Sequence, residues 1–256
     1  MPEPLPRTPS FRLDGRRALV TGAGRGIGRA AAAALANAGA AVTLVARSDE
    51  EIATAARQIE ELGGVAEATR LDVSDLAAVA ALFAERPAFD ILVNNAGTNR
   101  PMPMQNVTEA DYDAVVDLNV KSAFFVAQAC ARSLIRDGKP GSLIHMSSQM
   151  GHVGGPSRSL YCASKWALEG MSKAFALDLA GHRIRSNTIA PTFIETPLTK
   201  PYFENPTFKA SVLAMIKLGR IGRVEDLMGA VLYLASDAST MMTGTSMIVD
   251  GGWTAE

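Results

Sequence analysis

The chain has few of the residues that bind metals or cross-link protein chains. Its 256 residues include only two cysteines and three histidines. Cys130 and Cys162 form no metal-binding or disulfide-like spacing, which is typical of ordinary thiols in a reducing compartment. The histidines (His145, His152 and His182) have no metal-motif spacing either. We therefore expect no metal site.

Neither sign of charge predominates, and no long apolar segment is present. The 25 basic and 26 acidic residues give a net charge of −1 without a basic block, which excludes an electrostatic footprint for nucleic acid or for an anionic membrane. Residues 1–10 are polar, rich in proline and without an apolar stretch of signal-peptide length, and no later run approaches the length needed to cross a bilayer. These absences predict a cytoplasmic protein that contacts neither nucleic acid nor membrane, with residues 1–14 as a flexible N-terminal segment.

Short apolar runs alternate with helical segments along the rest of the chain, and 48% of all residues are hydrophobic. The expected strands are 17–21, 42–46, 65–71, 90–93, 142–146, 185–190 and 246–249. The expected helices are 27–38, 49–62, 76–84, a long helix from Thr108 toward Ile135, 159–180 and 224–235, whereas 193–218 is predicted to be irregular. The alternation predicts an α/β fold: one doubly wound Rossmann-type domain over residues 15–256, with a parallel sheet of about seven strands, helices on both faces, and 192–218 as a substrate-binding loop or lid.

A glycine-rich turn, residues 21–28, joins the first strand to the first helix. Glycines at this position allow a tight turn and let backbone N–H groups approach a phosphate, which also meets the positive end of the helix dipole. The spacing is not G-x-G-x-x-G, and a glycine cluster alone is weak evidence, but its strand–turn–helix context predicts a site for a nucleotide pyrophosphate. Like residues 94–97, Ser148 and the loop after Ala190, the turn follows the carboxyl end of a strand, so these segments should face one crevice.

The second strand carries no carboxylate for the adenosine ribose. An NAD site of this kind normally has an acid near the end of that strand, but residues 42–48 contain none and end in Arg47. Together with Arg25 in the glycine turn, Arg47 would suit the 2′-phosphate of NADP, although a solvated surface charge is the alternative. We expect NADP(H) to be favoured, with NAD(H) as the second possibility.

Tyr161 and Lys165 are one helical turn apart. Positions i and i+4 project from the same face of a helix, so the ammonium should lie beside the phenol and lower its pKa toward a useful range. Ser148 follows a buried-looking strand, where its hydroxyl could bind a substrate oxygen. Taken alone, such a pair is more often an ordinary structural contact, with the tyrosine capping a core and the lysine in solvent.

These motifs together resemble those of a classical short-chain dehydrogenase/reductase, over nearly the whole chain. The family's glycine motif matches Thr21-Gly22-x-x-x-Gly26-x-Gly28, its turn after the fourth strand matches Asn94-Asn95-Ala96-Gly97, and its catalytic motif matches Tyr161-x-x-x-Lys165. Asn119 resembles the asparagine of the family's catalytic tetrad. Asp72 resembles the family residue that contacts the adenine ring. The family's thirteen-residue gap to the tyrosine selects Ser148 rather than Ser147.

The resemblance implies hydride transfer between nicotinamide and a ketone or secondary alcohol. Tyr161 would be the general acid or base, Lys165 would lower its pKa and bind the nicotinamide ribose, and Ser148 would hold the substrate oxygen. Asn119 would help hold a water that links Lys165 to solvent. The implied cofactor-binding residues are Gly22, Arg25, Gly26, Ile27, Gly28, Arg47, Asp72, Val73, Asn95, Ala96, Gly97, Tyr161, Lys165, Pro191, Ile194 and Thr196. One departure is Pro191-Thr192, where the family usually has Pro-Gly.

The substrate is the least determined part of the resemblance. The residues that the family uses as a substrate wall correspond here to Gln149, Met150, His152, Phe193 and Tyr202. Polar members would suit a polyol, a sugar acid or a hydroxy-ketone, which we favour, and the aromatic ones would suit a broad carbonyl reductase. A reductase of 3-oxoacyl groups on an acyl carrier is an alternative, for which Arg100, Arg158 and Lys200 are scattered candidates.

A cofactor-sensing regulatory module is the non-enzyme alternative. Such a module would be expected to lack some of Ser148, Tyr161 and Lys165, and all three are present. The helices that begin at Thr108 and Ser159 are apolar on more than one face, and family members often pair these helices, so we expect a homodimer or homotetramer.

Overall fold

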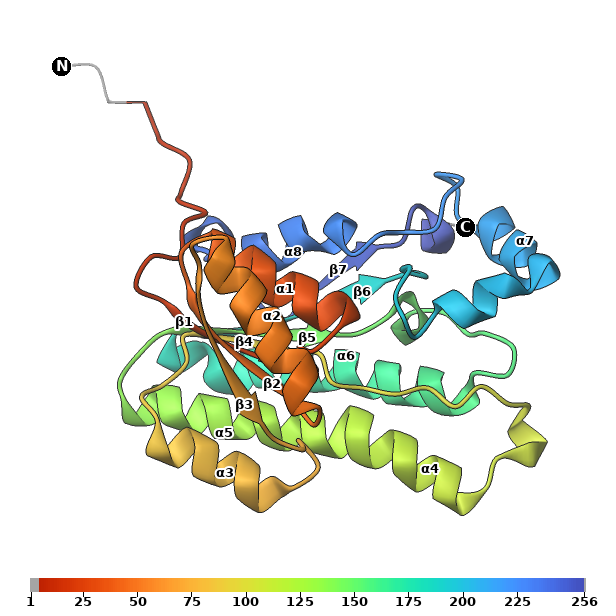
Figure 1. Ribbon diagram of the computed structural model, residues 1–256, viewed down its shortest axis with the longest axis horizontal. Helices are drawn as coiled ribbons and strands as arrows, with labels where there is room; N and C mark the ends of the chain where they lie inside the picture. The colour runs from red at the N-terminus through yellow and green to blue at the C-terminus, as the bar shows by residue number, and fades with distance from the viewer. Residues whose placement is uncertain (1–4, 256) are drawn as a thin grey trace.

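The computed structural model describes residues 5–255 and contains one seven-stranded sheet (Figure 1). The strand order is β3-β2-β1-β4-β5-β6-β7, and every neighbouring pair is parallel. The strands are β1 Arg17–Thr21, β2 Ala41–Ala46, β3 Val65–Arg70, β4 Ile91–Asn94, β5 Gly141–Met146, β6 Ile184–Pro191 and β7 Ser246–Val249. The doubly wound fold is confirmed, and its strand order reverses between β1 and β4, where such sheets bind ligands.

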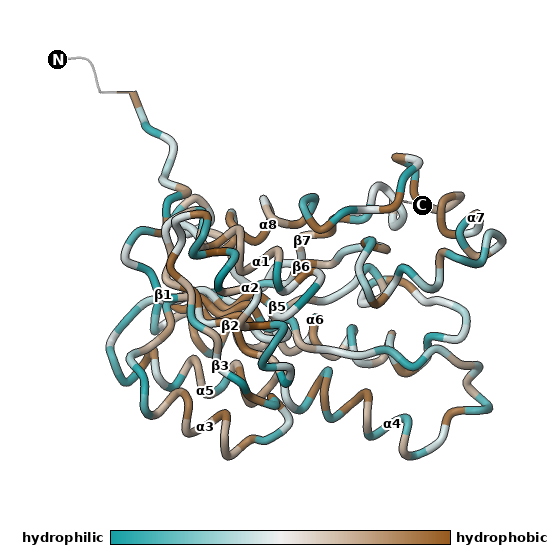
Figure 2. The backbone as a smooth tube through the Cα atoms, viewed as in Figure 1, coloured by the Kyte–Doolittle hydropathy of each residue, from teal (hydrophilic) through white to brown (hydrophobic). Residues whose placement is uncertain are grey.

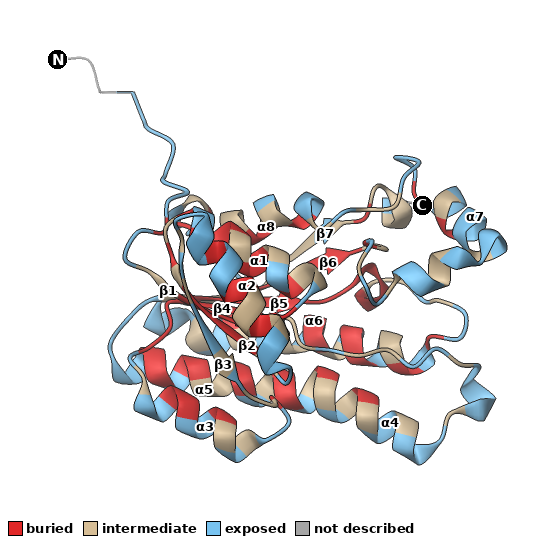
Figure 3. Ribbon diagram, in the orientation of Figure 1, coloured by how far each residue is buried: buried red, intermediate tan, exposed pale blue. Residues whose placement is uncertain are grey.

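Helices cover both faces of the sheet (Figure 1). One layer contains α1 Gly26–Asn37, α2 Asp49–Glu61 and α8 Glu225–Ala235, and the other contains α3 Leu76–Glu85, α5 Ala123–Arg136 and α6 Ser159–Leu179. Successive side chains of a strand point to opposite faces, so Val20 belongs to the first core and Leu19 to the second. Hydrophobic and buried residues therefore concentrate in the sheet and on the inner helix faces (Figures 2 and 3).

The predicted long helix contains a wider turn in its middle. It begins as α4, Glu109–Val116, after the capping box formed by Thr108 and Asp111. A π-helical segment, Asp117–Ser122, then leads into α5. Single π turns are rare and often lie at functional sites, and this one carries Asn119.

By length and composition, the joined helix Glu109–Arg136 could cross a bilayer. The sequence analysis expected no run with this property. In the structure 44% of the relevant window is buried, and Val115, Val126 and Ala127 are core residues. Core packing thus accounts for the apolar composition of the helix.

The segment 193–218 is more regular than predicted. It contains a short 3-10 helix, Lys200–Glu204, and the ten-residue helix α7, Pro206–Met215. Asn205 caps α7 by accepting a hydrogen bond from the N–H of Phe208, and Pro206 occupies the first turn. The prediction of an irregular segment was wrong because this Asn-Pro start signal was overlooked.

The N-terminal segment joins the fold at Leu13. Residues 1–4 lie outside the described residues, and 5–12 are exposed and have no regular secondary structure (Figures 1 and 3). Leu13 is buried and donates its N–H to the carbonyl of Ala38, and the ring of Phe11 lies 6.2 Å from that of Tyr233. The predicted flexibility of 1–14 stays a prediction.

Candidate active site

A cavity of about 740 Å³ lies at the carboxyl ends of the strands, where the strand order reverses. The glycine turn, the loops after β2, β3, β4 and β5, the start of α6 and the loop after β6 all contribute to its wall. Of the sixteen residues predicted to bind the cofactor, all but Gly28 line it. The structure therefore brings most of the site residues expected from the sequence to one crevice, as the topology required.

Two backbone turns are locked together at the nucleotide end. The side-chain amide of Asn95 donates to the carbonyls of Thr21 and Gly22 at 3.0 and 3.3 Å, and the N–H groups of Asn95 and Ala96 donate to Thr21 Oγ1 at 2.9 and 3.0 Å. Gly28 does not line the cavity because it packs beneath the turn. A Cβ there would lie 2.3 Å from the carbonyl oxygen of Gly22, so only glycine fits.

The first turn of α1 is suited to a phosphate. It has no side-chain cap and no acidic residue, so its N–H groups are free to bind an anion at the positive end of the helix. Gly22 and Gly26 have positive φ angles of 64° and 56°, which shape the loop above the helix. These features fit the pyrophosphate of a dinucleotide.

Charged side chains surround the expected adenosine position. Arg25 pairs with Glu51 at 3.5 Å, and Arg47 is exposed at the end of β2. Asp72 accepts hydrogen bonds from the hydroxyl and the N–H of Ser74, which lower its pKa, with a smaller contribution from Arg47. Glu51 also lines the cavity, and the sequence analysis missed it because it belongs to the helix after β2 rather than to the strand.

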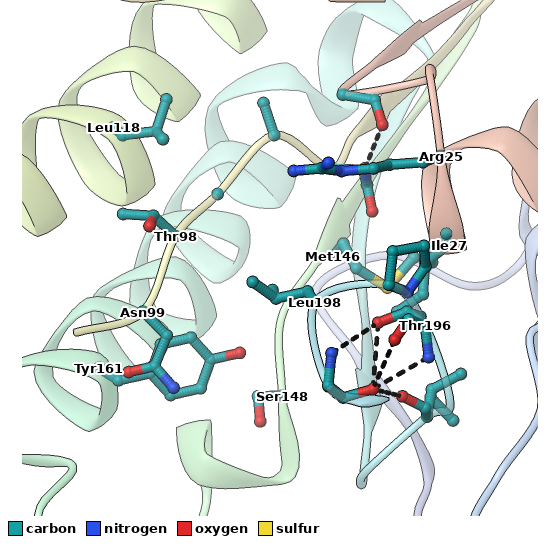
Figure 4. A pocket seen from close by; sticks show the side chains of 18 of the residues that line it. Arg25, Ile27, Thr98, Asn99, Leu118, Met146, Ser148, Tyr161, Thr196 and Leu198 are labelled. Atoms are coloured by element: carbon teal, nitrogen blue, oxygen red, sulfur yellow. Dashed lines mark hydrogen bonds between the residues drawn. The ribbon is translucent and has the colours of Figure 1, made fainter. Parts of the chain in front are cut away.

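Tyr161, Lys165 and Ser148 meet at the opposite end of the cavity. Figure 4 shows Tyr161 and Ser148 near Asn99 and Leu198, away from Arg25 and Ile27. Lys165 is buried, its Nζ lies 5.5 Å from the centre of the Tyr161 ring, and it donates a 2.8 Å hydrogen bond to the carbonyl of Met146. Burial lowers the pKa of Lys165 to about 8, although the carboxylate of Glu169 partly offsets this effect.

The pKa of Tyr161 differs from the expectation. The sequence analysis predicted a value lowered by Lys165, but burial raises the pKa of the phenol. Hydrogen bonding with Ser148 and the nearby guanidinium of Arg158 oppose this rise, and Lys165 makes no appreciable contribution. The ammonium is directed to the carbonyl of Met146, which explains the difference. In this structure, therefore, Tyr161 holds its proton at neutral pH.

Asn119 is close to the catalytic residues but does not line the cavity. Its side-chain oxygen accepts the N–H of Thr98 at 2.8 Å, and its Nδ2 donates to the carbonyl of Thr98 at 2.9 Å and to Ser164 Oγ at 3.0 Å. The side chain thus fixes the loop after β4 against α6. In this structure it is a positioning residue, and the predicted role in holding a water stays a prediction.

Four of the five predicted substrate residues line the cavity: Gln149, Met150, Phe193 and Tyr202. His152 does not. Its Nε2 lies 2.9 Å from Ser246 Oγ and 3.3 Å from the buried carboxylate of Glu169. The proposed substrate role of His152 is thus not supported, because the side chain connects the loop after β5 to α6 and β7.

Sequence reasoning missed several polar residues of the catalytic end. Asn99 lines the cavity just beyond the turn 94–97, and Ser147 and Thr192 line it beside residues that were predicted. Arg158 also lines it, although the sequence analysis considered it only as part of a surface patch. Their positions next to recognised motifs were the available signal.

The arrangement suits proton transfer beside a bound nicotinamide. A dinucleotide held by the glycine turn would supply or accept the hydride. The protonated Tyr161 can donate to a carbonyl oxygen, and Ser148, whose hydroxyl accepts the N–H of Met150 at 3.1 Å, can donate to the same oxygen. The hydrogen bond with Ser148 and the guanidinium of Arg158 favour the phenolate left after proton transfer, because both lower the pKa of Tyr161.

Comparisons with known proteins agree with this geometry. A family model described as enoyl-(acyl carrier protein) reductase matches residues 22–254. The chain is 38% identical to the D-erythrulose reductase of Gallus gallus over 245 residues, which cover 96% of this chain and 98% of that protein. It is 39% identical to the L-xylulose reductase of Bos taurus, again over 245 residues, with 96% and 99% covered.

A solved structure has the same fold. It is a gluconate 5-dehydrogenase from Burkholderia cenocepacia J2315 in complex with NADP and tartrate, and its TM-score to this chain is 0.92. The two sequences are 39% identical, with 96% of this chain and 98% of the other covered. Together with the confirmed fold and the match over residues 22–254, these relationships establish that the chain belongs to the classical short-chain dehydrogenase/reductase family of NAD(P)-dependent oxidoreductases.

Proposed function

We propose that this protein interconverts a ketone and a secondary alcohol on a small, polyhydroxylated substrate, using NADP(H) and Tyr161 as the general acid or base. The substrate class comprises ketoses, polyols and sugar acids. The observation that carries the proposal is the wall of the catalytic end. Asn99, Ser147, Gln149 and Thr192 all line this wall, and each has a buried side-chain oxygen (Asn99 Oδ1, Ser147 Oγ, Gln149 Oε1 and Thr192 Oγ1) without a hydrogen-bond partner within residues 5–255.

Buried polar atoms normally have partners, so four unpaired ones in residues of one cavity wall point to a ligand that supplies partners once these side chains turn toward it. A substrate with several hydroxyl groups has the matching donors and acceptors, whereas a simple aliphatic ketone has only one polar group. The relatives named for erythrulose, xylulose and gluconate act on compounds of this kind, which supports the same class here.

The preference for NADP(H) rests on the adenosine end. Arg47 is exposed at the end of β2, no carboxylate occupies the strand, and Arg25 offsets the charge of Glu51. A guanidinium is the group best suited to a 2′-phosphate. The related gluconate 5-dehydrogenase structure contains NADP, which supports this choice.

The acyl-carrier alternative has little support from the charges near the cavity. Arg100 is paired with Asp111 at 2.7 Å, and Arg158 is buried, so neither adds to a surface patch for an acidic carrier. Of the three candidates, Lys200 alone is an exposed cation without an acidic partner within residues 5–255. The alternative of a cofactor-sensing regulatory module has no support, because the catalytic side chains are all present and oriented together.

We also propose a cytoplasmic homodimer or homotetramer. Large apolar side chains remain exposed on α5 and α6, among them Phe125, Trp166 and Leu177, and a second copy would cover them. The measurement is the mass in solution by light scattering. A monomer at micromolar concentration would refute the assembly.

The test of the function is a pair of cofactor titrations followed by a substrate panel. Thermal stabilisation by NADPH should exceed that by NADH at equal concentration, because a ligand stabilises in proportion to the logarithm of its excess over its Kd. Arg47→Asp should remove the difference, whereas Arg57→Asp, on the exposed face of α2, should not. Binding of neither cofactor, or no oxidation or reduction of ketoses, polyols or sugar acids by the loaded enzyme, would refute the proposal.

A further inference from the structure

Arg158 is the unusual charge of the catalytic end. It precedes α6 by one residue, is only 7% exposed and lines the cavity. Its Nη1 has no hydrogen-bond partner, and no acidic side chain pairs with it in the part of the chain that the structure describes. Burying an unpaired charge is unfavourable, so a guanidinium held in this way indicates a ligand that completes it.

The surrounding residues hold the guanidinium in place. It lies over the ring of Tyr202, with 5.6 Å between Cζ and the ring centre, and its aliphatic stem approaches Gly155. It is close enough to Tyr161 to influence the phenol. Arg158 is thus fixed between the catalytic tyrosine and the loop after β6, within reach of a substrate whose carbonyl is at Tyr161.

We propose that Arg158 binds the carboxylate of the substrate, and that the enzyme acts on sugar acids in preference to the corresponding neutral polyols and ketoses. This inference rests on the proposed function and narrows its substrate class. The planar guanidinium fork matches a carboxylate through two parallel hydrogen bonds.

The local charge favours a carboxylate over a phosphate. Within the described residues, the two carboxylates of the cavity wall, Glu51 and Asp72, are at the adenosine end, so no carboxylate of the wall lies beside Arg158 to repel an anion. Lys165 is engaged with the carbonyl of Met146, and Arg100 with Asp111. Arg158 is the remaining cation, and its single charge balances the one negative charge of a carboxylate. A sugar phosphate carries close to two negative charges, which Arg158 alone would not balance. The free acceptors Asn99 Oδ1 and Gln149 Oε1 then remain for the hydroxyl groups of the sugar chain.

Matched pairs of acids and polyols test the proposal. Each pair has the same carbon chain and hydroxyl configuration and differs in one terminal carboxylate: D-gluconate with D-sorbitol, D-galactonate with galactitol, and D-xylonate with xylitol. With saturating NADP⁺, kcat/KM should be higher for the acid in at least one pair. Arg158→Met should lower the ratio of the acid value to the polyol value by about 10- to 150-fold, the range for one hydrogen bond to a charged group, because any change at the phenol of Tyr161 affects both members of a pair alike.

Two further variants separate charge from structure. Arg158→Lys keeps the charge without the fork and should recover part of the loss. Arg57→Met removes an exposed arginine of α2 and should leave the ratio of acid to polyol unchanged. Thermal stabilisation of the NADP⁺ complex by each acid and polyol provides a readout that needs no turnover, and D-glucose 6-phosphate and D-fructose 6-phosphate serve as phosphate probes.

The outcomes distinguish this inference from the proposed function. Turnover of polyols or ketoses with no preference for any acid, or an equal loss on both members of a pair in Arg158→Met, would overturn the role of Arg158 and leave the proposed function intact. Stabilisation by the sugar phosphates but not by the acids would also overturn it. Absence of all turnover would refute the proposed function itself, and selective stabilisation by an acid that Arg158→Met abolishes would still support the carboxylate site.

Discussion

Replacing Lys165 with methionine should change the pH dependence of stability in a calculable way. Burial lowers the pKa of Lys165 from its ordinary value of 10.5 to about 8. Between these values the unfolded chain binds the proton more readily than the folded protein does. The free energy of unfolding therefore decreases as the pH falls from about 10.5 through 8, because the folded protein must then hold a buried ammonium. The loss is fully regained above pH 10.5.

The size of the effect follows from the same values. One unit of pKa difference corresponds to about 1.4 kcal/mol, so the difference between the unfolded and folded pKa of Lys165 corresponds to about 3 kcal/mol of unfolding free energy. The wild-type protein should thus gain roughly this amount relative to Lys165→Met between pH 7 and pH 10.5. The variant also loses the hydrogen bond to the carbonyl of Met146, but this loss adds a constant that does not depend on pH in this interval.

The assay is urea denaturation of both proteins at half-unit intervals from pH 6.5 to pH 10.5. Other groups that titrate in this range, such as Tyr161, cancel in the difference because Lys165 contributes little to the pKa of that phenol. Lys173→Met provides the matched control, since Lys173 is exposed on the same helix and its replacement should give a difference that is flat with pH. A flat difference for Lys165→Met as well would refute the reasoning, because it would mean that the ammonium is not desolvated in the folded protein.

Two further substitutions test the ends of the cavity. Tyr161→Phe removes the proton donor and should lower kcat by about 100- to 10,000-fold while the Kd for NADPH, measured by fluorescence titration, stays within about threefold; retention of more than a tenth of the wild-type rate would exclude Tyr161 as the general acid. Gly28→Ala places a methyl group 2.3 Å from the carbonyl oxygen of Gly22 and should cost about 1–3 kcal/mol in urea denaturation and weaken NADPH binding. Gly229→Ala in α8, where the added carbon meets nothing within 4 Å, should instead stabilise by about 0.5–1 kcal/mol, and equal effects at both glycines would contradict the packing argument.

The regular part of the fold could be predicted because local patterns determine it. Apolar runs that end in glycine or polar turns gave the strands β1 to β7 to within one residue at each end. The i, i+4 relation placed Tyr161 and Lys165 on one face of α6, and the rule for parallel sheets placed their partners in the same crevice. These inferences need only the neighbours of each residue in the sequence.

The details that failed depend on contacts between distant segments. His152 follows Ser148 by four residues, but Ser246 and Glu169, from β7 and α6, hold its ring outside the cavity wall. Asn119 lies in a π turn and bonds to Thr98, which is distant in the sequence, and hydrophobic periodicity indicates neither feature. The pKa of Tyr161 depends on burial, which a helical-wheel argument cannot supply.

The charges of the cavity suit anions although the chain as a whole is nearly neutral. The whole chain carries a net charge of −1, yet among the residues that the structure describes, five cationic side chains and two carboxylates line the cavity: Arg25, Arg47, Arg100, Arg158, Lys165, Glu51 and Asp72. Two of the cations are buried without an ion pair, and a charge in such surroundings acts more strongly than it does in water. The positive charge is consequently local, and it lies where we propose that the pyrophosphate, the 2′-phosphate and the substrate carboxylate bind. Buried cations without partners lower the free energy of unfolding of the free protein, and an anionic ligand that pairs with them raises it again. Binding is therefore selective for charge as well as for shape.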